Sequence, residues 1–190
     1  MRIIGGSRKG ARIFAPSGRD TRPTGDRVRE AAFNLIGPVD GASVLDLFAG
    51  SGAMGLEALS RGAAGAVFVE SDRDACRAVE RNLVKLGLTG ARVVCGDVLR
   101  FLASERAQYD LVLVDPPYEM VESQGMRLGP YLRAVLAENG LLVFESGAKT
   151  QPELPFHVRT SRRYGSARLT LFEHEPPSRS SGDAGEGREA

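Results

Sequence analysis

The hydrophobic residues fall into short apolar runs, separated by longer stretches in which apolar positions recur every three or four residues. Five runs have the length and composition of buried strands: Val44–Leu47, Ala66–Val69, Arg92–Cys95, Leu111–Val114 and Leu141–Phe144. Helical periodicity marks four segments between them: Met54–Arg61, Arg73–Leu86, Val98–Glu105 and, more weakly, Tyr131–Ala137. Strands that alternate with helices predict an α/β fold, in which a mainly parallel sheet is covered by helices on both faces.

The C-terminal part departs from this alternation. Two further strand-like segments, Phe156–Arg162 and Ala167–Glu173, are joined through Tyr164-Gly165. They predict an antiparallel hairpin that completes one edge of the sheet. Residues 176–190 are rich in Pro, Ser, Gly and charged residues, so we expect a disordered tail.

The N-terminal part also has a pattern of its own. Apolar pairs at positions 3–4 and 13–14 lie on either side of glycine-containing turns, which predicts a β-hairpin or an extended arm. The next segment has the pattern of a helix that is capped by Thr24 or Asp26 and ends at Gly37.

Length and composition fit one compact unit. A chain of 190 residues, of which 42% are hydrophobic, can bury a sizeable core in a single domain. We place this domain at residues 23–175, after an arm formed by residues 1–22.

The charge is distributed unevenly, although the net charge is only +1. Residues 1–29 hold eight basic and two acidic side chains, whereas residues 30–150 hold eleven basic and sixteen acidic ones. A basic end on an acidic body favours contact with a polyanion. A solvated basic arm without a partner would give the same pattern, so the charge alone leaves both interpretations open.

Cysteine and histidine are scarce. The two cysteines, Cys76 and Cys95, are a poor disulfide framework. The two histidines, His157 and His174, do not form a cluster with the cysteines at the spacing of zinc ligands. We therefore expect no metal and two reduced, buried cysteines in a cytoplasmic protein. The sequence has no signal-peptide pattern and no apolar run of 18 residues, so we expect no membrane span.

A glycine-rich turn follows the first predicted strand. Gly50, Gly52 and Gly55 have the spacing G-x-G-x-x-G between a strand and a helix, and such glycines let a ligand approach the backbone closely. Glu70 lies twenty residues after Gly50, at the end of the next strand, where a carboxylate can accept both hydroxyls of a ribose. These features fit either a nicotinamide-dependent enzyme or a methyltransferase.

Acidic residues around this turn favour the methyltransferase. Asp46 lies inside the first strand and is followed by Phe48-Ala49-Gly50, which resembles motif I of class I methyltransferases. A cationic sulfonium ligand tolerates this carboxylate, whereas a pyrophosphate would be repelled by it. Asp97, after the third strand, fits the position that binds an adenine amino group, although it can equally cap the helix that follows.

The tetrapeptide Asp115-Pro116-Pro117-Tyr118 directly follows the fourth strand, where ligands sit in open α/β sheets. An amino group on a base is a poor nucleophile because its lone pair is delocalised into the ring. The Asp115 carboxylate and the Pro116 carbonyl can accept hydrogen bonds from such an amine and aim its nitrogen at a methyl donor. Tyr118 offers a face on which the base can stack.

These motifs, taken in order, resemble N-methyltransferases that act on bases, and three flanking stretches narrow the match. They are Met1-Arg2-Ile3-Ile4-Gly5-Gly6, Arg22-Pro23-Thr24-Gly25-Asp26-Arg27-Val28-Arg29-Glu30-Ala31 and Leu56-Glu57-Ala58-Leu59-Ser60-Arg61-Gly62-Ala63. With Arg163-Tyr164-Gly165, they resemble the RsmD family over about residues 1–174. Gly25 stands where that family usually has a second threonine.

The resemblance implies a class I, Rossmann-like fold with a seven-stranded, mainly parallel sheet. It implies transfer of a methyl group from S-adenosylmethionine to N2 of guanine 966 in bacterial 16S ribosomal RNA. The RNA would be presented within the 30S subunit or an assembly intermediate. We expect a cytoplasmic monomer that needs no metal.

Motifs and resemblance together assign candidate site residues. The expected cofactor-binding residues are Asp46, Phe48, Ala49, Gly50, Gly52, Glu70, Ser71, Asp97, Val98 and Asp115. The expected catalytic residues are Asp115, Pro116 and Tyr118. The resemblance makes the N-terminal arm the RNA-binding element, with Arg2, Arg8, Lys9, Arg12, Arg22 and Arg27 as its contacts.

Three other functions compete with this assignment. An adenine-N6 methyltransferase acting on DNA or RNA uses a similar tetrapeptide, but the DNA enzymes need a sequence-reading domain for which the chain has no room. A non-catalytic RNA-binding assembly factor would not require the intact Asp115-Pro116-Pro117-Tyr118. A nicotinamide-dependent dehydrogenase would require a second, substrate-binding domain.

Overall fold

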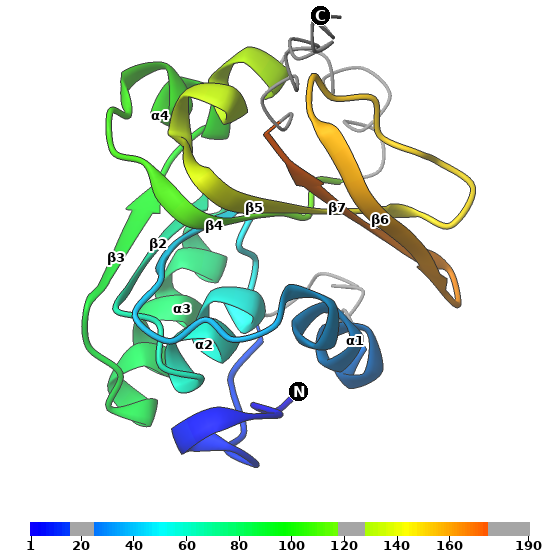
Figure 1. Cartoon of the computed structure of the whole chain (residues 1–190). Helices are drawn as coiled ribbons and strands as arrows, with labels where there is room; N and C mark the ends of the chain where they lie inside the picture. Colours follow the sequence, from blue (N-terminus) through cyan, green and yellow to red (C-terminus); the bar gives the residue numbers. More distant parts are fainter. Residues whose placement is uncertain (16–24, 118–127, 175–190) are drawn as a thin grey trace, which may run out of the picture.

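The computed structural model describes residues 1–15, 25–117 and 128–174. Within them, one sheet contains seven strands in the order β3-β2-β1-β4-β5-β7-β6 (Figure 1). The strands are β1 (Ser43–Leu47), β2 (Gly65–Glu70), β3 (Ala91–Cys95), β4 (Tyr109–Val114), β5 (Leu136–Gly147), β6 (His157–Tyr164) and β7 (Ala167–Glu173). Strands β1 to β5 are parallel, and β7 is antiparallel to both β5 and β6. The predicted mainly parallel sheet with an antiparallel C-terminal hairpin is confirmed.

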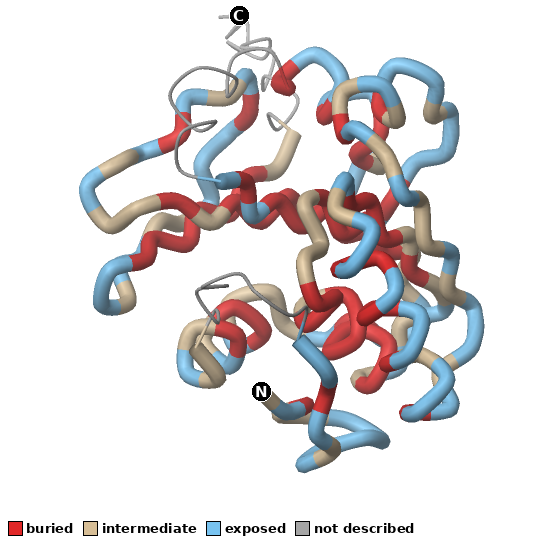
Figure 2. The backbone as a smooth tube through the Cα atoms, turned by 180° about the vertical axis from the view of Figure 1, so that it is seen from behind, coloured by how far each residue is buried: buried red, intermediate tan, exposed pale blue. Residues whose placement is uncertain are grey.

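Helices cover both faces of the sheet. The helices α1 (Asp26–Ile36), α2 (Ala53–Ser60) and α3 (Arg73–Leu86) pack on one face, and α4 (Val98–Ser104) packs on the other, together with a helix over residues 128–135. Successive side chains of a strand point to opposite faces of the sheet, so Val44 belongs to the first core cluster and Leu45 to the second. Figure 2 shows the buried strands running through the middle of the molecule between more exposed surfaces.

The predicted bounds differ from the structure before and within β5. The weak helix expected at Tyr131–Ala137 lies at 128–135, and the strand expected at Leu141–Phe144 is β5, which already begins at Leu136. Leu136 pairs with Tyr109, and regular pairing resumes only at Leu141. Residues 137–140 form an irregularity that interrupts the apolar alternation, so the sequence pattern detects only the regular part of the strand.

The predicted side-chain cap of α1 is wrong for Asp26. The N-cap residue is Gly25, which has no side chain to cap with, and Asp26 is the first residue of the helix. The Asp26 carboxylate instead accepts hydrogen bonds from Arg29 Nη2 at 3.0 Å and from Arg2 Nε at 3.3 Å. Thr24, the alternative cap, lies outside the described residues.

The N-terminal residues form the predicted hairpin, and they pack directly on α2. Ile3 donates its N–H to Ala11 O at 2.9 Å and accepts from Gly10 N at 2.8 Å, with a short 3-10 helix (η1, Gly6–Arg8) between them. Gly6 has a φ of +72°, and a Cβ there would lie 1.8 Å from the carbonyl oxygen of Ser60 at the end of α2. Glycine at position 6 is therefore required both by the backbone conformation and by this close approach.

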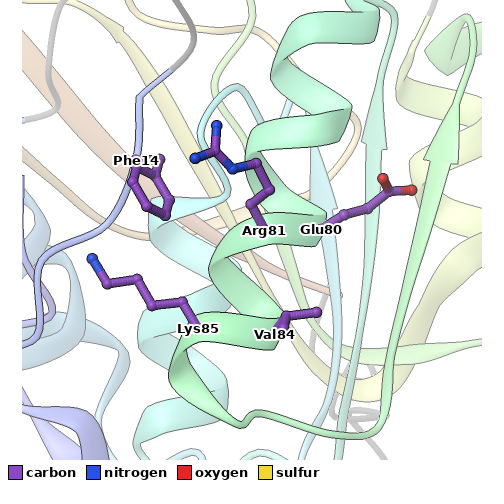
Figure 3. A pocket seen from close by; sticks show the side chains of 5 residues that line it. All are labelled: Phe14, Glu80, Arg81, Val84 and Lys85. Carbon is purple, nitrogen blue, oxygen red and sulfur yellow. The ribbon is translucent and has the colours of Figure 1, made fainter.

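Phe14 continues this segment onto α3 (Figure 3). Its backbone N–H donates to Asn82 Oδ1 at 2.7 Å, and its carbonyl accepts from Asn82 Nδ2 at 3.0 Å. Asn82 is fully buried and also donates to Ser51 O in the glycine-rich turn, at 3.2 Å. A single buried amide thus ties the N-terminal segment, α3 and the turn together.

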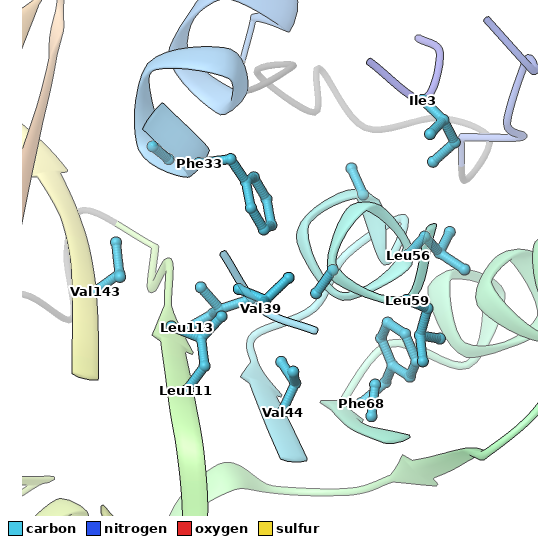
Figure 4. Close-up of a cluster of buried hydrophobic side chains, with 14 of the residues drawn as sticks. Ile3, Phe33, Val39, Val44, Leu56, Leu59, Phe68, Leu111, Leu113 and Val143 are labelled. Atoms are coloured by element: carbon cyan, nitrogen blue, oxygen red, sulfur yellow. The ribbon is translucent and has the colours of Figure 1, made fainter. Parts of the chain in front are cut away.

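The larger core cluster lies between the sheet and the helices α1 to α3 (Figure 4). Phe33 of α1 and Phe68 of β2 are its largest apolar side chains, and both are buried. Ile3 is 0% exposed and lies above α2 on the side of Leu56. The N-terminal hairpin is therefore part of the hydrophobic core.

One expectation about cysteine is wrong. Cys76 is buried in α3, as expected, but Cys95 is exposed, because it ends β3 at the open edge of the sheet. Burial and then a hydrogen bond with Cys95 raise the pKa of Cys76 to about 12.

Candidate active site

The carboxyl ends of β2, β1 and β4 bring three predicted segments together. Leu47, the last residue of β1, pairs with Val69 on one side and with Val114 on the other. The next residue along each strand is therefore Phe48 in the middle, flanked by Glu70 and Asp115. This is the edge at which parallel α/β sheets bind their ligands.

The turn between β1 and α2 uses left-handed backbone conformations. Phe48, Gly50 and Gly52 have φ values of 59°, 53° and 76°. A non-glycine residue in this region costs about 1–3 kcal/mol unless its surroundings hold it there. The Phe48 side chain packs against the second core cluster, and Ala49 donates its N–H to Val69 O at 3.1 Å. These contacts fix the conformation of the turn at the carboxyl-terminal edge of the sheet.

The Asp46 side chain hydrogen-bonds to the first turn of α2 and does not point into solvent. Its Oδ2 accepts the N–H of Gly55 at 2.9 Å, and the residue is only 3% exposed. A Cβ at Gly55 would lie 2.4 Å from the ring of Phe68 and 3.0 Å from Asp46 Oδ2. The third glycine of the motif is therefore required for close packing of α2 on the sheet.

The electrostatics of this edge are strongly acidic. Burial raises the pKa of Asp46 from 3.8 to about 8, even though the hydrogen bond from Gly55 lowers it. The charges of Asp115 and Glu70 make smaller contributions to this raised pKa, so the three carboxyl groups lie close enough to interact. A cation at this edge would relieve their mutual repulsion.

Glu70 connects the turn to the end of β2. Its Oε2 accepts the N–H of Gly50 at 2.9 Å, and its Oε1 accepts the N–H of Asp72 at 2.8 Å and the hydroxyl of Ser71 at 3.3 Å. The residue is 8% exposed. Because a carboxylate has about four acceptor positions, these three bonds leave about one for a ligand hydroxyl. Glu70 therefore shapes the turn, a role that the sequence did not reveal, and its contact with a ribose stays a prediction.

Asp97 caps α4, one of the two roles considered for it. Its Oδ1 accepts the N–H of Arg100 at 2.8 Å, while the residue itself remains exposed beyond the end of β3. Val98, the first residue of α4, is buried. Asp97 therefore lies at the same edge as Glu70, because Gly96 donates its N–H to Glu70 O at 2.8 Å.

The Asp-Pro-Pro segment leaves β4 beside the turn. Asp115 is exposed and directs its N–H to Leu47 O, 3.5 Å away, while Pro116 is buried and Pro117 is exposed. Tyr118, the predicted stacking residue, lies outside the described residues.

The predicted RNA-binding residues fall into two groups. Lys9, Arg12 and Arg27 are exposed. Arg2 is also exposed but pairs with Asp26, and Arg8 donates through its guanidinium to the carbonyls of Leu86 and Gly87 at the C-terminal end of α3. Arg8 thus has a structural contact in addition to any RNA contact. Arg22 lies outside the described residues.

Two further findings concern the described residues only. In this part of the chain, no helix is long and apolar enough to cross a membrane. The same residues contain no group of three His, Cys, Asp or Glu side chains that could hold a metal ion.

Known proteins resemble this chain over nearly its whole length. The family model described as "Conserved hypothetical protein 95" matches residues 1–173. Ribosomal RNA small subunit methyltransferase D of Escherichia coli (strain K12) is 36% identical over 196 aligned positions, which cover 96% of this chain and 94% of that protein. The chain belongs to the RsmD family.

Solved structures agree with this membership. A hypothetical protein of Thermus thermophilus, 35% identical, has a TM-score of 0.78 and covers 91% of this chain and 99% of its own. A more distant protein, SMU.776, was solved in complex with SAH. It is 17% identical, has a TM-score of 0.66 and covers 77% of this chain and 48% of its own, so it shares the fold. As predicted, this RsmD-family chain has the fold and the family of an S-adenosylmethionine-dependent methyltransferase.

Proposed function

We propose that this RsmD-family protein transfers a methyl group from S-adenosylmethionine to the N2 amine of a guanine in 16S ribosomal RNA, at guanine 966 or its equivalent. The observation that carries the proposal is the position of Asp115. It leaves β4 beside the glycine-rich turn and close enough to Asp46 to raise the pKa of that residue. The name of the Escherichia coli relative supports small-subunit ribosomal RNA as the substrate.

The residues at this edge fit the cofactor. The turn from Phe48 to Gly52 lies at this edge, Glu70 keeps about one acceptor position for a ribose hydroxyl, and Asp97 can accept from an adenine amino group. The acidic edge complements a cation, which the raised pKa of Asp46 reflects. When bound, S-adenosylmethionine supplies a methyl group activated by its positively charged sulfur. The remaining expected contacts are Ala49, Gly50, Ser71 and Val98.

The chain's own groups position the nucleophile. The Asp115 carboxylate and the Pro116 carbonyl accept the two N–H bonds of the target amine, which keeps electron density on the nitrogen. With S-adenosylmethionine bound, the nitrogen held by Asp115 and Pro116 would accept the methyl group, the cofactor's sulfur would keep the bonding electron pair, and the proton displaced from the amine would pass to the Asp115 carboxylate. Such positioning supplies most of the rate enhancement in a direct displacement, and misplacement by about 1 Å costs roughly a hundredfold.

The basic N-terminal residues are proposed to hold the RNA. Lys9, Arg12 and Arg27 present exposed charges, and Arg2 can exchange its contact with Asp26 for a phosphate. Phosphate contacts position a nucleic acid without reading its sequence. We propose that the protein acts in the cytoplasm, as a monomer, on the 30S subunit or its assembly intermediate.

A labelling experiment tests the proposal. The protein is incubated with tritiated S-adenosylmethionine and either unmodified 16S rRNA or 30S particles that lack the modification, and the labelled nucleoside is identified after digestion. We expect N2-methylguanosine, and we expect Asp115→Asn to lower single-turnover transfer by roughly a hundredfold while cofactor binding persists.

The matched control is Glu138→Gln, which removes an exposed carboxylate from the irregular part of β5. It should keep wild-type activity. N6-methyladenosine as the product would contradict the guanine assignment. Full activity of Asp115→Asn would contradict the proposed role of the carboxylate.

A further inference from the structure

A row of basic side chains follows α3 away from the candidate active site. Its members are exposed and spaced four residues apart: Arg73, Arg77, Arg81 and Lys85. A helix rises 1.5 Å per residue, so neighbours are about 6 Å apart along the axis and the row is about 18 Å long. Because α3 begins directly after Glu70-Ser71-Asp72, the row starts at the cofactor-binding edge of the sheet.

An exposed aromatic side chain lies beside the far half of this row. The ring centroid of Phe14 is 4.2 Å from Arg81 Cζ and 4.5 Å from Lys85 Nζ, and Phe14 is 38% exposed. Figure 3 shows both cationic side chains directed toward the ring. The two hydrogen bonds between Phe14 and the buried Asn82 fix the backbone of Phe14, so this arrangement is built into the fold.

A hollow of about 580 Å³ lies beside Phe14 and the two cationic side chains that contact its ring. It is lined by Phe14, Glu80, Arg81, Val84 and Lys85, and its surface is largely apolar. Val84 is 84% exposed, whereas Val79 and Leu86 of the same helix are buried. The surface therefore combines an apolar floor with cations at its rim.

We propose that this surface is a second RNA-binding site that holds an unpaired stretch of the substrate outside the active site. We define the α3–Phe14 surface as Phe14, Arg73, Arg77, Arg81, Val84 and Lys85. This inference rests on the proposed function, because it takes the RNA to be the strand whose guanine enters the active site.

The chemistry of the surface matches single-stranded RNA. Unstacked bases bind on aromatic rings and on arginine guanidinium planes, and Phe14 with Arg81 offers both. The spacing of about 6 Å along the row is close to that of phosphates on an extended strand. Helix α3 carries four basic residues and two acidic ones, Asp74 and Glu80, so its net positive charge complements a polyanion. An acidic protein segment is the competing ligand that the experiment must distinguish.

The test measures binding of a fluorescent, unmodified 16S rRNA transcript to the full-length protein without cofactor, over a range of salt concentrations. The double variant Arg81→Gln with Lys85→Gln should flatten the log–log salt dependence by up to about 1.4, since each lost single-strand phosphate contact contributes about 0.7. Phe14→Leu should leave the slope unchanged and weaken binding roughly fivefold to hundredfold through lost stacking.

The control removes the same charge from the opposite face of the sheet, with Arg100→Gln and Arg106→Gln on and beside α4. Its affinity and salt slope should stay close to those of the wild type. As a second measurement, a photo-crosslinking benzophenone residue in place of Val84 should crosslink to the RNA, and the same residue in place of Glu138 should not.

Two results would overturn the inference: α3 variants that bind RNA like the control, or crosslinking at position 84 no stronger than at position 138. Crosslinking at position 84 to protein in place of RNA within purified 30S particles would assign the surface to a ribosomal protein.

Methyl transfer is measured separately. If the wild type transfers no methyl group but the α3 variants lose RNA affinity, only the proposed function is refuted. If the wild type methylates RNA but the α3 variants bind RNA normally, only this inference is refuted.

Discussion

Arg29 and Glu57 form an ion pair in which neither side chain is exposed to solvent. Arg29 Nε lies 3.6 Å from Glu57 Oε2, and both side chains are 0% exposed. Glu57 also accepts the N–H groups of Ile4 and Gly5, at 2.8 and 2.7 Å. Arg29 donates to the carbonyl of Arg2. The pair therefore joins α1, α2 and the N-terminal hairpin at one point.

Breaking this pair should be costly. In Glu57→Gln, the buried guanidinium of Arg29 loses one carboxylate partner and keeps Asp26 as another, Arg61 loses its partner on α2, and one of the two backbone N–H groups faces an amide NH2. We expect the free energy of unfolding to fall by about 3 kcal/mol or more, measured by urea denaturation. Glu138→Gln, an exposed control, should change it by less than about 0.5 kcal/mol. Equal losses in the two variants would show that the ion pair does not stabilise the junction.

Gly55→Ala should lower the melting temperature. Alanine is the better helix former by about 1 kcal/mol, but its Cβ would meet the Phe68 ring at 2.4 Å. Overpacking of this kind costs about 1–3 kcal/mol, which corresponds to a decrease of roughly 2–10 °C. At Gly96 a Cβ would meet nothing within 4 Å, so Gly96→Ala should melt like the wild type. A stabilised Gly55→Ala protein would contradict the close packing described for α2.

The raised pKa of Asp46 predicts a pH dependence for stability and for cofactor binding. Since the ordinary pKa of this side chain is 3.8 and its pKa in the folded protein is about 8, only the folded form holds the proton between these values. The contribution of Asp46 to the free energy of unfolding is therefore largest below about pH 4, and it is lost as the pH rises toward 8. Asp46→Asn should remove this part of the profile, as seen in denaturation curves between pH 5 and 9.

Cofactor affinity should follow the opposite trend. A sulfonium cation favours the ionised carboxylate, so binding of S-adenosylmethionine should strengthen from pH 6 to about pH 8 and then level off. Calorimetry in buffers of different ionisation enthalpy should detect release of a proton on binding below pH 8. Binding that is independent of pH, with no proton released, would mean that the cation lies too far from Asp46 to influence it.

Glu70→Gln should weaken cofactor binding by more than the loss of a ribose contact suggests. The carboxylate accepts from Gly50 N and Asp72 N on its two oxygens, whereas glutamine must turn its NH2 toward one of these donors. We expect the Kd for S-adenosylmethionine to rise roughly tenfold to hundredfold, measured by calorimetry, because hydrogen bonds to charged groups contribute about 1.5–3 kcal/mol each. An unchanged Kd would show that Glu70 neither contacts the ribose nor holds the turn in the conformation that binds the cofactor.

Sequence periodicity predicted the central fold well, because the central strands β1 and β4 are short, mainly apolar runs bounded by turn residues. Val44–Leu47 and Leu111–Val114 are buried on both faces, so their patterns leave little ambiguity. The sequence also placed Asp46 inside the first strand and Glu70 and Asp115 at strand ends, and parallel topology brings such ends together at one edge.

Interactions between distant segments could not be predicted in this way. Glu57 looks like an ordinary polar position of α2, and only the tertiary structure shows the backbone N–H groups of Ile4 and Gly5 that it accepts. The clamp of Asn82 on Phe14 spans 68 residues, and nothing local to either residue indicates it. The Gly5-Gly6 pair was the one available signal of close backbone approach, and it did not identify the partner helix.

The dependence of the N-terminal hairpin on α2 has a consequence for the order of events during synthesis. Ile4 and its acceptor Glu57 are 53 residues apart, and Phe14 and Asn82 are 68 apart. At about 5–20 residues per second, the ribosome adds Glu57 roughly 3–10 seconds after Ile4. During that interval Ile3 and Ile13 have no surface to pack against. The first segment to be translated is therefore among the later ones to reach its final place, and a newly made chain must pass through a stage in which its beginning is exposed.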